Sequence, residues 1–402
     1  MVDMLKEITK TYKYRLYPSL QQEELLAKHF GCTRFVYNKF LALRQEQYRL
    51  TGKSDNYYAQ SNLLTQLKKE QEYKWLKDVN AQSLQHSLRH LEIAYTRFFT
   101  GKGGYPKFKK KNNRNSFTVP QFITLKDNKL FIPKFKNGIK IKLHRELQGN
   151  ILFATISKTP TNKYYVSITV KQEYNSKEPT CKEVGIDLGI KDLVITSNGE
   201  KFKNNKYLLK YEKELKKAQQ HLSRKKNGSN RYEKQRLKVA LIHEKIANCR
   251  SDVLHKISHK LVMQNDVVYL ENLNVKDMLK NHKLAKSISD CSFYELTRQL
   301  EYKGDWDDTY IHKIFRFYPS SKTCNKCGYI KQDLTLSDRE WVCPSCNTRH
   351  DRDINASINI LLEGKREISV GTIDNTNGED VRPIISNTNR QTSMKLGAIC
   401  FS

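Results

Sequence analysis

The spacing of hydrophobic and polar residues changes several times along the chain, and each change predicts a new element. Tyr12, Tyr14 and Leu16 alternate with basic residues, which is the period of a half-buried strand. Ser19, with Gln22 three residues later, matches a helix-starting capping box. Apolar residues then recur at helical spacing in two sets: Cys32, Phe35, Val36, Phe40 and Leu43, then Leu84, Leu88, Leu91, Tyr95 and Phe98. The first 100 residues should therefore be one strand followed by helices.

Short apolar runs separated by polar turns dominate the next part of the chain and predict a small barrel or sheet. The expected strands are 129–133, 139–143, 151–156 and 164–170. A strand, turn and strand should follow around Asp187, and further strands are predicted at 267–273 and 311–317. We expect two long helices in 201–250 with a break at 226–230, a polar loop up to about residue 289, and a helix at 294–306. The residues from 365 to 402 are polar and lack either period, so we predict a largely disordered tail.

Charge adds a prediction about the partner. The chain has 402 residues, enough for two or three domains, and its 72 Lys and Arg against 42 Asp and Glu give a net charge of +30. A polyanion is the expected partner, with nucleic acid favoured over an anionic membrane surface. The basic residues are concentrated in 93–126 and 201–250. The sequence shows neither a signal peptide nor an apolar run of about 18 residues, which predicts a soluble protein of the cytoplasm.

Four of the nine cysteines form two knuckles, Cys324-x2-Cys327 and Cys343-x2-Cys346, separated by 15 residues. This spacing is that of a zinc ribbon, and four thiolates leave no open position for water, so a structural Zn2+ is predicted. We expect His350 to lie outside the metal shell as an ordinary surface or turn histidine.

Three acidic residues stand in settings that favour divalent cations. Asp187 lies between apolar residues of a predicted strand, Glu271 ends another strand, and Asp353 begins a predicted helix with Ala356 and Ile360 inward. Ionised carboxylates that converge in a buried place repel one another unless cations such as Mg2+ lie between them. Two such ions can activate water for phosphodiester hydrolysis, so the set predicts a metal-dependent nuclease.

Each acid also has a simpler interpretation. Asp192 and Asp351 are interpreted as solvated acids at strand ends, and Glu271 or Asp353 alone could be the same kind of residue. Gly185 and Gly189 strengthen the case for Asp187, because they allow backbone or phosphate to approach closely. The order Asp, Glu, Asp suits resolvase-type nucleases, whereas transposases of the cut-and-paste type with the same fold have Asp, Asp, Glu.

Motifs along nearly the whole chain resemble the TnpB family of transposon-associated RNA-guided DNA endonucleases, which are related to type V CRISPR effectors. The motifs are Tyr14-Arg-Leu-Tyr-Pro18, Arg34-Phe-Val-Tyr-Asn38, Ala94-Tyr-x-x-Phe-Phe99, Tyr105-Pro-Lys-Phe-Lys-Lys110, Gly185-Ile-Asp-Leu-Gly-Ile-Lys191, Leu284-Ala-Lys-Ser-Ile-Ser-Asp290, Pro319-Ser-Ser-x-x-Cys324 and His350-Asp-Arg-Asp-x-Asn-Ala356. The resemblance implies an α+β multidomain protein in which a wedge β-barrel is interrupted by a helical recognition lobe. It also implies an RNase H-like RuvC nuclease domain with an inserted zinc ribbon.

The implied domains are, in chain order, a first wedge strand at 1–18, the recognition lobe at 19–100, the wedge barrel at 101–178, RuvC at 179–318, the zinc ribbon at 319–349, a final RuvC helix at 350–364 and the tail at 365–402. By the same resemblance Asp187, Glu271 and Asp353 form the catalytic triad with two Mg2+ ions. The loop from Asn272 to Ser289 resembles a lid over the nuclease cleft, or is an ordinary mobile loop.

The implied partners are a guide RNA from the transposon end and double-stranded DNA beside a short transposon-adjacent motif. A monomer within a ribonucleoprotein, at the nucleoid of a prokaryotic cell, is expected. Tyr58 and Gln85 resemble readers of the adjacent motif, although Ala81 stands where a relative has lysine, and Gln85 is equally compatible with a solvated helix position. Lys107, Lys109, Lys110 and Lys111 are candidate phosphate contacts. Two alternative functions are an RNA-guided DNA-binding repressor or transposition accessory protein without cleavage, and a DNA transposase.

Overall fold

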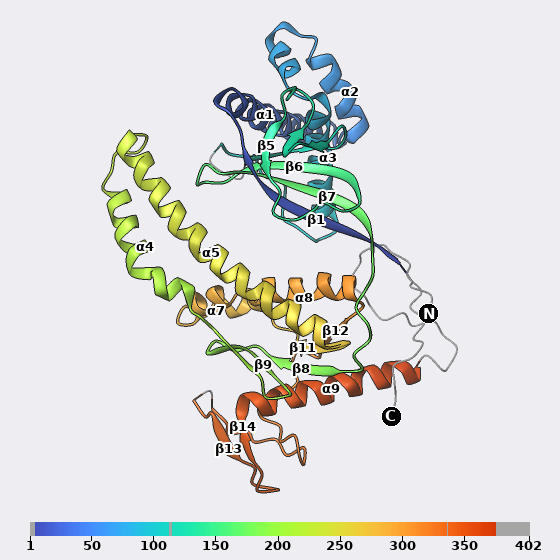
Figure 1. Cartoon of the computed structure of the whole chain (residues 1–402), viewed down its shortest axis with the longest axis vertical. Coiled ribbons are helices and arrows are strands. Elements are labelled where there is room, and N and C mark those ends of the chain that lie inside the picture. Colours follow the sequence, from blue (N-terminus) through green and yellow to red (C-terminus); the bar gives the residue numbers. More distant parts are fainter. Residues whose placement is uncertain (1–4, 112–114, 336, 375–402) are drawn as a thin grey trace. The chain divides into compact units, whose positions relative to one another are not determined.

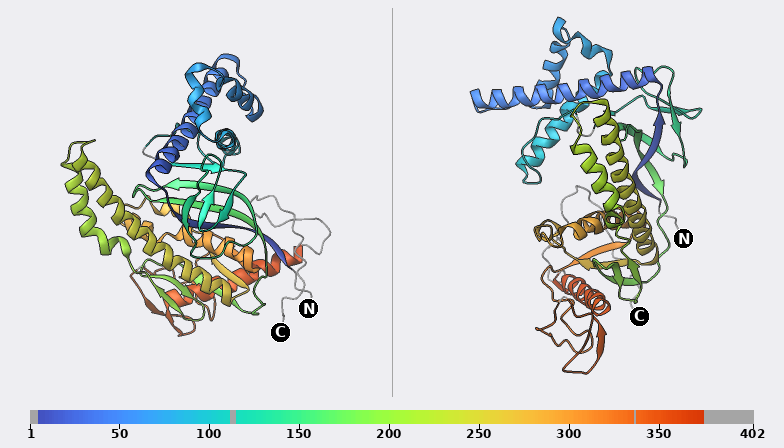
Figure 2. Two further views of the ribbon diagram at one scale, coloured as in Figure 1. Left: turned by 45° about the horizontal axis from the view of Figure 1, so that its top comes forward. Right: turned by 90° about the vertical axis from the view of Figure 1, so that its left-hand side faces the viewer.

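The computed structural model describes residues 5–111, 115–335 and 337–374. They form two compact units, divided after Tyr174, each with its own sheet and helices (Figure 1). The predicted α+β class is therefore confirmed. Each unit is described separately below, and Figure 2 gives two further views of their elements.

Helices interrupt the sheet of the first unit directly after its first strand. In chain order the elements are β1 (Lys6–Tyr17), α1 (Leu20–Thr51), α2 (Tyr57–Leu67), the 3-10 helix η1 (Gln71–Asp78), α3 (Ala81–Phe99), β2 (Asn115–Val119), β3 (Thr124–Lys126), β4 (Lys129–Phe131), β5 (Ile139–Lys142), β6 (Asn150–Lys158) and β7 (Tyr164–Tyr174). The strand order is β2-β6-β7-β1-β5-β4-β3, so β1 lies in the middle of a sheet whose other strands come after the helices. Among the described strands β2 and β3 are the two edges, which makes this a curled half-barrel rather than a closed barrel.

The capping box at the start of α1 is confirmed. The Ser19 hydroxyl accepts from the backbone N–H of Gln22, and the Gln22 side chain accepts from the backbone N–H of Ser19. The predicted apolar face of α3 is also confirmed for Leu84, Leu88, Leu91 and Tyr95, which are buried. Phe98 was assigned to that face wrongly, because it is exposed at the end of the helix.

The second unit carries a five-stranded sheet with a different connectivity. Its elements are β8 (Glu183–Asp187), β9 (Asp192–Thr196), β10 (Lys201–Lys203), α4 (Tyr207–Ser223), α5 (Asn230–Gln264), β11 (Val267–Glu271), α6 (Val275–Met278), α7 (Ala285–Cys291), α8 (Phe293–Asp307), β12 (Tyr310–Ile314), β13 (Glu340–Val342), β14 (Arg349–Asp351) and α9 (Arg352–Asp374). The order is β10-β9-β8-β11-β12. β8, β11 and β12 run parallel, whereas β9 and β10 are antiparallel to their neighbours.

Helices cover both faces of this second sheet. Val184 and Ile186 of β8 and Val268 and Leu270 of β11 pack against α5, α7 and α8. Val267 and Tyr269, which alternate with them, pack against Ile360 of α9 on the opposite face (Figure 1). Because successive side chains of a strand point to opposite faces, the alternation assigns the odd-numbered positions of β8 and β11 to the α9 face.

Two predictions about element limits were wrong. Residues 365–374 were predicted to belong to a disordered tail, yet α9 continues to Asp374. Long-range contacts explain this, because Glu367 accepts hydrogen bonds from the backbone N–H of Phe315 and pairs with His312, and Ile368 packs on the sheet. The remaining tail lies outside the described residues. The segment predicted as a polar loop up to residue 289 contains the short helices α6 and α7.

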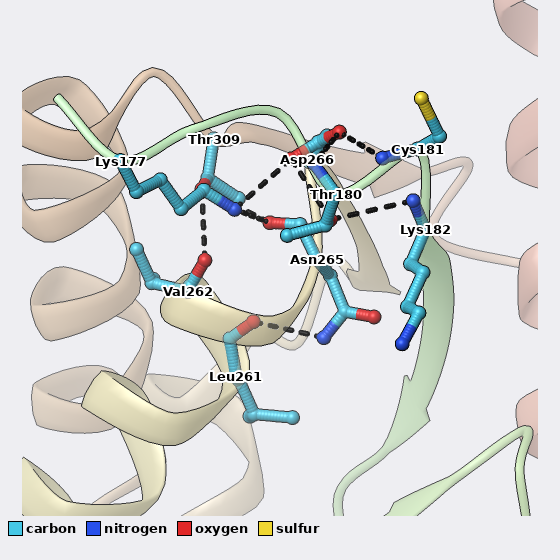
Figure 3. A network of polar contacts seen from close by, with 9 residues as sticks. All are labelled: Lys177, Thr180, Cys181, Lys182, Leu261, Val262, Asn265, Asp266 and Thr309. Carbon is cyan, nitrogen blue, oxygen red and sulfur yellow. Dashed lines mark hydrogen bonds and ion pairs between the residues drawn. The ribbon is translucent and has the colours of Figure 1, made fainter. Parts of the chain in front are cut away.

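A polar network fixes the entry of the chain into the second sheet (Figure 3). The Asp266 carboxylate, just before β11, accepts from the backbone N–H groups of Thr180 and Cys181 and from the Thr180 hydroxyl. Lys177 donates to the same carboxylate at 3.0 Å and to the carbonyl of Asn265. Desolvation acts to raise the pKa of Asp266, but these donors outweigh it and hold the pKa below its ordinary value. The network therefore ties the segment before β8 to the start of β11 at the end of the sheet opposite Asp187 and Glu271.

We predict that Asp266→Asn lowers the melting temperature at pH 7, with a loss of about 1 to 3 kcal/mol because the buried Lys177 ammonium and two backbone N–H groups lose their charged acceptor. The lowered folded-state pKa stabilises the protein above the unfolded value of about 4, and this stabilisation disappears as the pH falls through the folded value. The difference between variant and parent should therefore narrow below about pH 4 in thermal unfolding. The control is Asp252→Asn, which removes an exposed ion pair with Lys256 and should change little. An equal loss in both variants would contradict the prediction.

No helix among the described segments is both long enough and apolar enough to cross a membrane.

Candidate functional site

Asp187 and Glu271 end two neighbouring parallel strands on the same face of the sheet. β8 and β11 pair in register up to Ile186 opposite Leu270, so the next two positions in that register are Asp187 and Glu271. Adjacent strands lie about 4.8 Å apart. Both acids occupy odd positions and therefore share the face that α9 covers. The two side chains that the sequence analysis places at strand ends are thus neighbours in space.

Asp353 comes to the same place because α9 begins there and runs back along the sheet. A Cβ added to Gly185 would lie 2.2 Å from the carbonyl oxygen of Ser357, one helical turn after Asp353. Further along, Lys365 pairs with Glu183 at 2.6 Å, at the opposite end of β8. The missing side chain at Gly185 lets the helix backbone touch the strand, which supports the expectation of close approach at this glycine. Asp353 therefore lies at the carboxyl end of the sheet, beside Asp187 and Glu271.

The electrostatics of Asp187 reflect this convergence. Loss of hydration, followed by the charges of Glu271 and then Asp353, raises the pKa of Asp187 to about 8. A metal-free centre would therefore hold a proton at neutral pH, and a divalent cation would displace it. The three acids are less tightly grouped than the cysteines. Among the described residues only the four cysteines form a group of three or more potential metal ligands whose ligand atoms all lie within 4.8 Å of one another.

The cysteine group has the geometry that a tetrahedral metal needs. The Sγ atoms of Cys324 and Cys346 are 3.6 Å apart, and those of Cys327 and Cys343 are 3.5 Å apart. Four thiolates at about 2.3 Å from one Zn2+ ion would have sulfur separations close to these values. The cluster can therefore hold a structural metal ion, and the donor set fits zinc.

His350 is outside the four-sulfur group, but the expectation of a surface or turn histidine was wrong. Its side chain is 5% exposed, and its ring contacts Trp341. Its Nε2 atom lies 3.0 Å from Sγ of Cys324. In the tautomer with its proton on Nε2, His350 would donate to this sulfur and offset part of the negative charge of a thiolate, from outside the four-cysteine group.

The polypeptide that enters the ribbon is bound directly to α9 and to one of the three acids. Buried Asn355 and Asn359 both donate to the carbonyl of Thr323, at 2.7 and 2.6 Å. The hydroxyl of Ser320 donates to Oε1 of Glu271 at 2.6 Å. No local pattern marks Ser320 as a partner of Glu271, because the two residues lie 49 positions apart. The contact could have been found only from the fold.

Asp351 was interpreted wrongly as a solvated acid. One of its carboxylate oxygens accepts from the backbone N–H groups of Asp353 and Ile354, and the other pairs with Lys201 at 2.6 Å. It therefore caps the start of α9, where unpaired N–H groups need acceptors. The cap fixes the turn from which Asp353 projects. Arg339 adds a cation 3.5 Å from the Asp353 carboxylate.

The predicted readers of the adjacent motif separate in the structure of the first unit. Gln85 lines a pocket of about 180 Å³ together with Tyr57, Gln82, His86 and Arg89. Tyr58 is not among the lining residues and is 75% exposed. The polar lining comes from one face of α3, where residues recur every three or four positions, so helical periodicity identifies its members. Within the pocket region, Gln82 Oε1 and His86 Nδ1 are buried polar atoms without a hydrogen-bond partner among the described residues.

The four candidate lysines lie in the segment after α3, and all are exposed. Lys109 differs from the others, because its ammonium lies 3.9 Å from the centre of the Tyr37 ring. Its backbone N–H donates a hydrogen bond to the side-chain oxygen of Asn38 at 2.8 Å, and its carbonyl accepts one from the side-chain amide of Asn38 at 2.9 Å. The segment is therefore anchored on α1 at Lys109, and the ammonium groups of Lys107, Lys110 and Lys111 are accessible to an anionic partner.

A metal-supporting cysteine ribbon beside three converging acids, in a strongly basic α+β chain, defines a candidate nucleic-acid enzyme. Comparisons with known proteins agree with that class. A sequence profile described as "Probable transposase" matches residues 165–282, a "Cas12f1-like, TNB domain" profile matches 293–360, and a "Helix-turn-helix domain" profile matches 4–53. The "Putative RNA-guided DNA endonuclease" of Streptomyces pristinaespiralis is 38% identical over 90% of both chains. InsQ of Escherichia coli, named in the same way, is 31% identical over 90% of this chain and 94% of its own. The chain belongs to the TnpB family.

Solved structures give a weaker comparison. The structure titled "Structure of the mini-RNA-guided endonuclease CRISPR-Cas_phi3" aligns with 89% of this chain and 92% of its own, at 9% identity and a TM-score of 0.44. A "Cas12f1-sgRNA-target DNA complex" aligns with 88% and 99%, at 16% identity and a TM-score of 0.35. Values below 0.5 are too low to support an inference about the site, which therefore depends on the contacts described above.

The raised pKa of Asp187 predicts a pH-dependent cost to stability. The unfolded chain ionises this acid near pH 4, whereas the folded protein retains the proton up to about pH 8. Between these values the unfolded state binds fewer protons, so stability falls as the pH rises. Without added Mg2+ or Mn2+, Asp187→Asn should be more stable than the parent by about 1 to 3 kcal/mol at pH 8, and the gain should shrink toward pH 4. Asp192→Asn, on the neighbouring strand, is the control. A gain that is equal at both pH values would contradict the prediction.

Zinc content tests the cysteine cluster. The purified chain should contain about one zinc per molecule by elemental analysis. Cys343→Ser should lose most of the metal and melt at a lower temperature, because a structural metal contributes directly to folding. Cys249→Ser, which changes a cysteine outside the cluster, should keep both the metal and the melting temperature. A chain that holds well under one zinc when folded would overturn the assignment.

Proposed function

We propose that the protein is an RNA-guided DNA endonuclease of a transposon. In this proposal the second unit is an RNase H-like RuvC nuclease with the zinc ribbon inserted before its last helix, and the first unit holds the wedge and recognition elements. The observation that carries the proposal is the convergence of Asp187, Glu271 and Asp353 at one edge of a sheet, in a chain of net charge +30. The strand order, with three antiparallel strands followed by two parallel ones, supports the RuvC assignment. The names of the full-length relatives support RNA guidance.

The acids suit hydrolysis of a phosphodiester. Their mutual repulsion and poor hydration disfavour three bare negative charges, so hard cations such as Mg2+ are the partners that they require. When bound, two such ions would activate water and neutralise the charge of the departing oxygen. The protein contributes fixed positions: β8 and β11 hold two acids in register, and the Asp351 cap holds the third. Cations held by these carboxylate oxygens would also bind the phosphate groups of the substrate.

Two further surfaces are assigned to nucleic acid. The exposed lysines after α3 and the basic helices α4 and α5 would follow the phosphates of guide RNA and heteroduplex. The pocket on α3 would read the adjacent motif, since the amide of Gln85 can pair with an adenine edge in a major groove. The binding unit in this proposal is one chain with one guide RNA and one double-stranded target. Cleavage of the vacated donor site would support retention of the element.

A plasmid cleavage assay tests the nuclease. The chain purified with its transposon-end RNA should cut a plasmid that carries the matching target beside a library of flanking sequences, and only when Mg2+ is present. Asp187→Ala should reduce the cleavage rate at least about a hundredfold, because it removes a ligand that the other two acids cannot replace. The control is Asp192→Ala, which should cut normally.

The same assay separates the alternatives. Target binding without cutting in the parent chain would identify a repressor or accessory protein. Equal cutting with and without RNA would eliminate RNA guidance. Undiminished cutting by Asp187→Ala would place the nuclease centre elsewhere.

A further inference from the structure

We infer that Ser320 is a positioning residue for the carboxylate centre, through which the ribbon sets the orientation of Glu271. This inference rests on the proposed function, because it concerns the same three acids. The central contact is the hydrogen bond of 2.6 Å from the Ser320 hydroxyl to Oε1 of Glu271. The bond occupies one carboxylate oxygen and leaves the other available to a cation shared with Asp187 and Asp353.

Ser320 is itself held on both sides. Its side chain is 5% exposed, and its carbonyl accepts from the buried amide of Asn359 at 2.8 Å. Asn359 lies on α9, so the residue that orients Glu271 is attached to the same helix that presents Asp353. A serine on a mobile backbone would often donate to water in place of Glu271. The backbone of Ser320 is held by Asn359, so its hydroxyl stays close to Glu271. A hydrogen bond to a charged carboxylate is stronger than one between neutral groups, most of all when its donor is already in place.

The cysteine cluster lies at the other end of this short segment. Asn359 and Asn355 hold the carbonyl of Thr323, and the next residue, Cys324, is one of the four sulfur ligands. Asn355 also accepts from the backbone N–H of Asn325, inside the first knuckle, at 3.1 Å. A continuous set of hydrogen bonds within one unit therefore connects the cysteine cluster to Glu271. A structural metal and the catalytic acids are joined by Ser320, with no ligand in common.

Binding of Mn2+ tests the inference apart from cleavage. The full-length, zinc-loaded chain without RNA is titrated with Mn2+, and free Mn2+ is measured by electron paramagnetic resonance. Ser320→Ala should raise the dissociation constant about tenfold, as expected when a supporting hydrogen bond to a metal ligand is lost. Ser320→Thr, which keeps the hydroxyl, should bind nearly as the parent does. Ser369→Ala is the matched control, because that hydroxyl donates only to a carbonyl of its own helix, at 2.9 Å.

Asp187→Asn separates failure of this inference from failure of the proposed function. If Asp187→Asn binds Mn2+ as the parent does, the carboxylate centre is not the metal site and the proposed function fails. If Asp187→Asn loses Mn2+ but Ser320→Ala does not, only the positioning role of Ser320 is wrong. Zinc content and melting temperature are measured for each variant. Weaker Mn2+ binding that accompanies zinc loss in Ser320→Ala would assign Ser320 to ribbon folding and overturn the inference.

Discussion

The contact between α9 and the second sheet at Gly185 is the constraint on which the candidate site depends. Asp187 and Glu271 are placed by strand register alone, but Asp353 is about 80 residues further along and reaches them only because the helix touches β8 backbone to backbone. An alanine at Gly185 would have its Cβ 2.2 Å from the Ser357 carbonyl, so the helix would have to shift. A shift of that size moves the start of α9, and with it the third acid. The absence of a side chain at Gly185 thus determines where the third acid lies.

The charge distribution explains how the fold tolerates three acids whose proximity lowers its stability. Three acids at one sheet edge cost stability, as the pKa of about 8 for Asp187 indicates. The surrounding cations, among them Arg339 beside Asp353, offset part of that cost without neutralising the centre. What remains is a concentration of negative charge at this edge that divalent cations would offset, and the proposed function depends on that property.

The sequence predicts those parts of the protein that local patterns determine. Short apolar runs identify β8 and β11, the Cys-x2-Cys spacing identifies the knuckles, and Ser19 with Gln22 identifies the start of α1. Features that depend on distant partners were missed or misread. The extension of α9 follows from Glu367 meeting β12, the ion pair of Asp351 from Lys201, and the burial of His350 from Trp341. In each case the residue type permits several roles, and only its neighbour in space decides among them.

The ribbon shows why a structural metal can matter for distant chemistry. Its own core consists of Leu334, Trp341 and two of the cysteines, which is too little apolar surface to hold a segment of this kind in one conformation. A metal ion at the four cysteines would therefore supply most of the order in the knuckles. Ser320 and Arg339 both belong to this segment and both approach the acids, at Glu271 and Asp353. Order supplied at the sulfurs would thus reach two carboxylates, because hydrogen bonds from Asn355 and Asn359 join the intervening residues to α9.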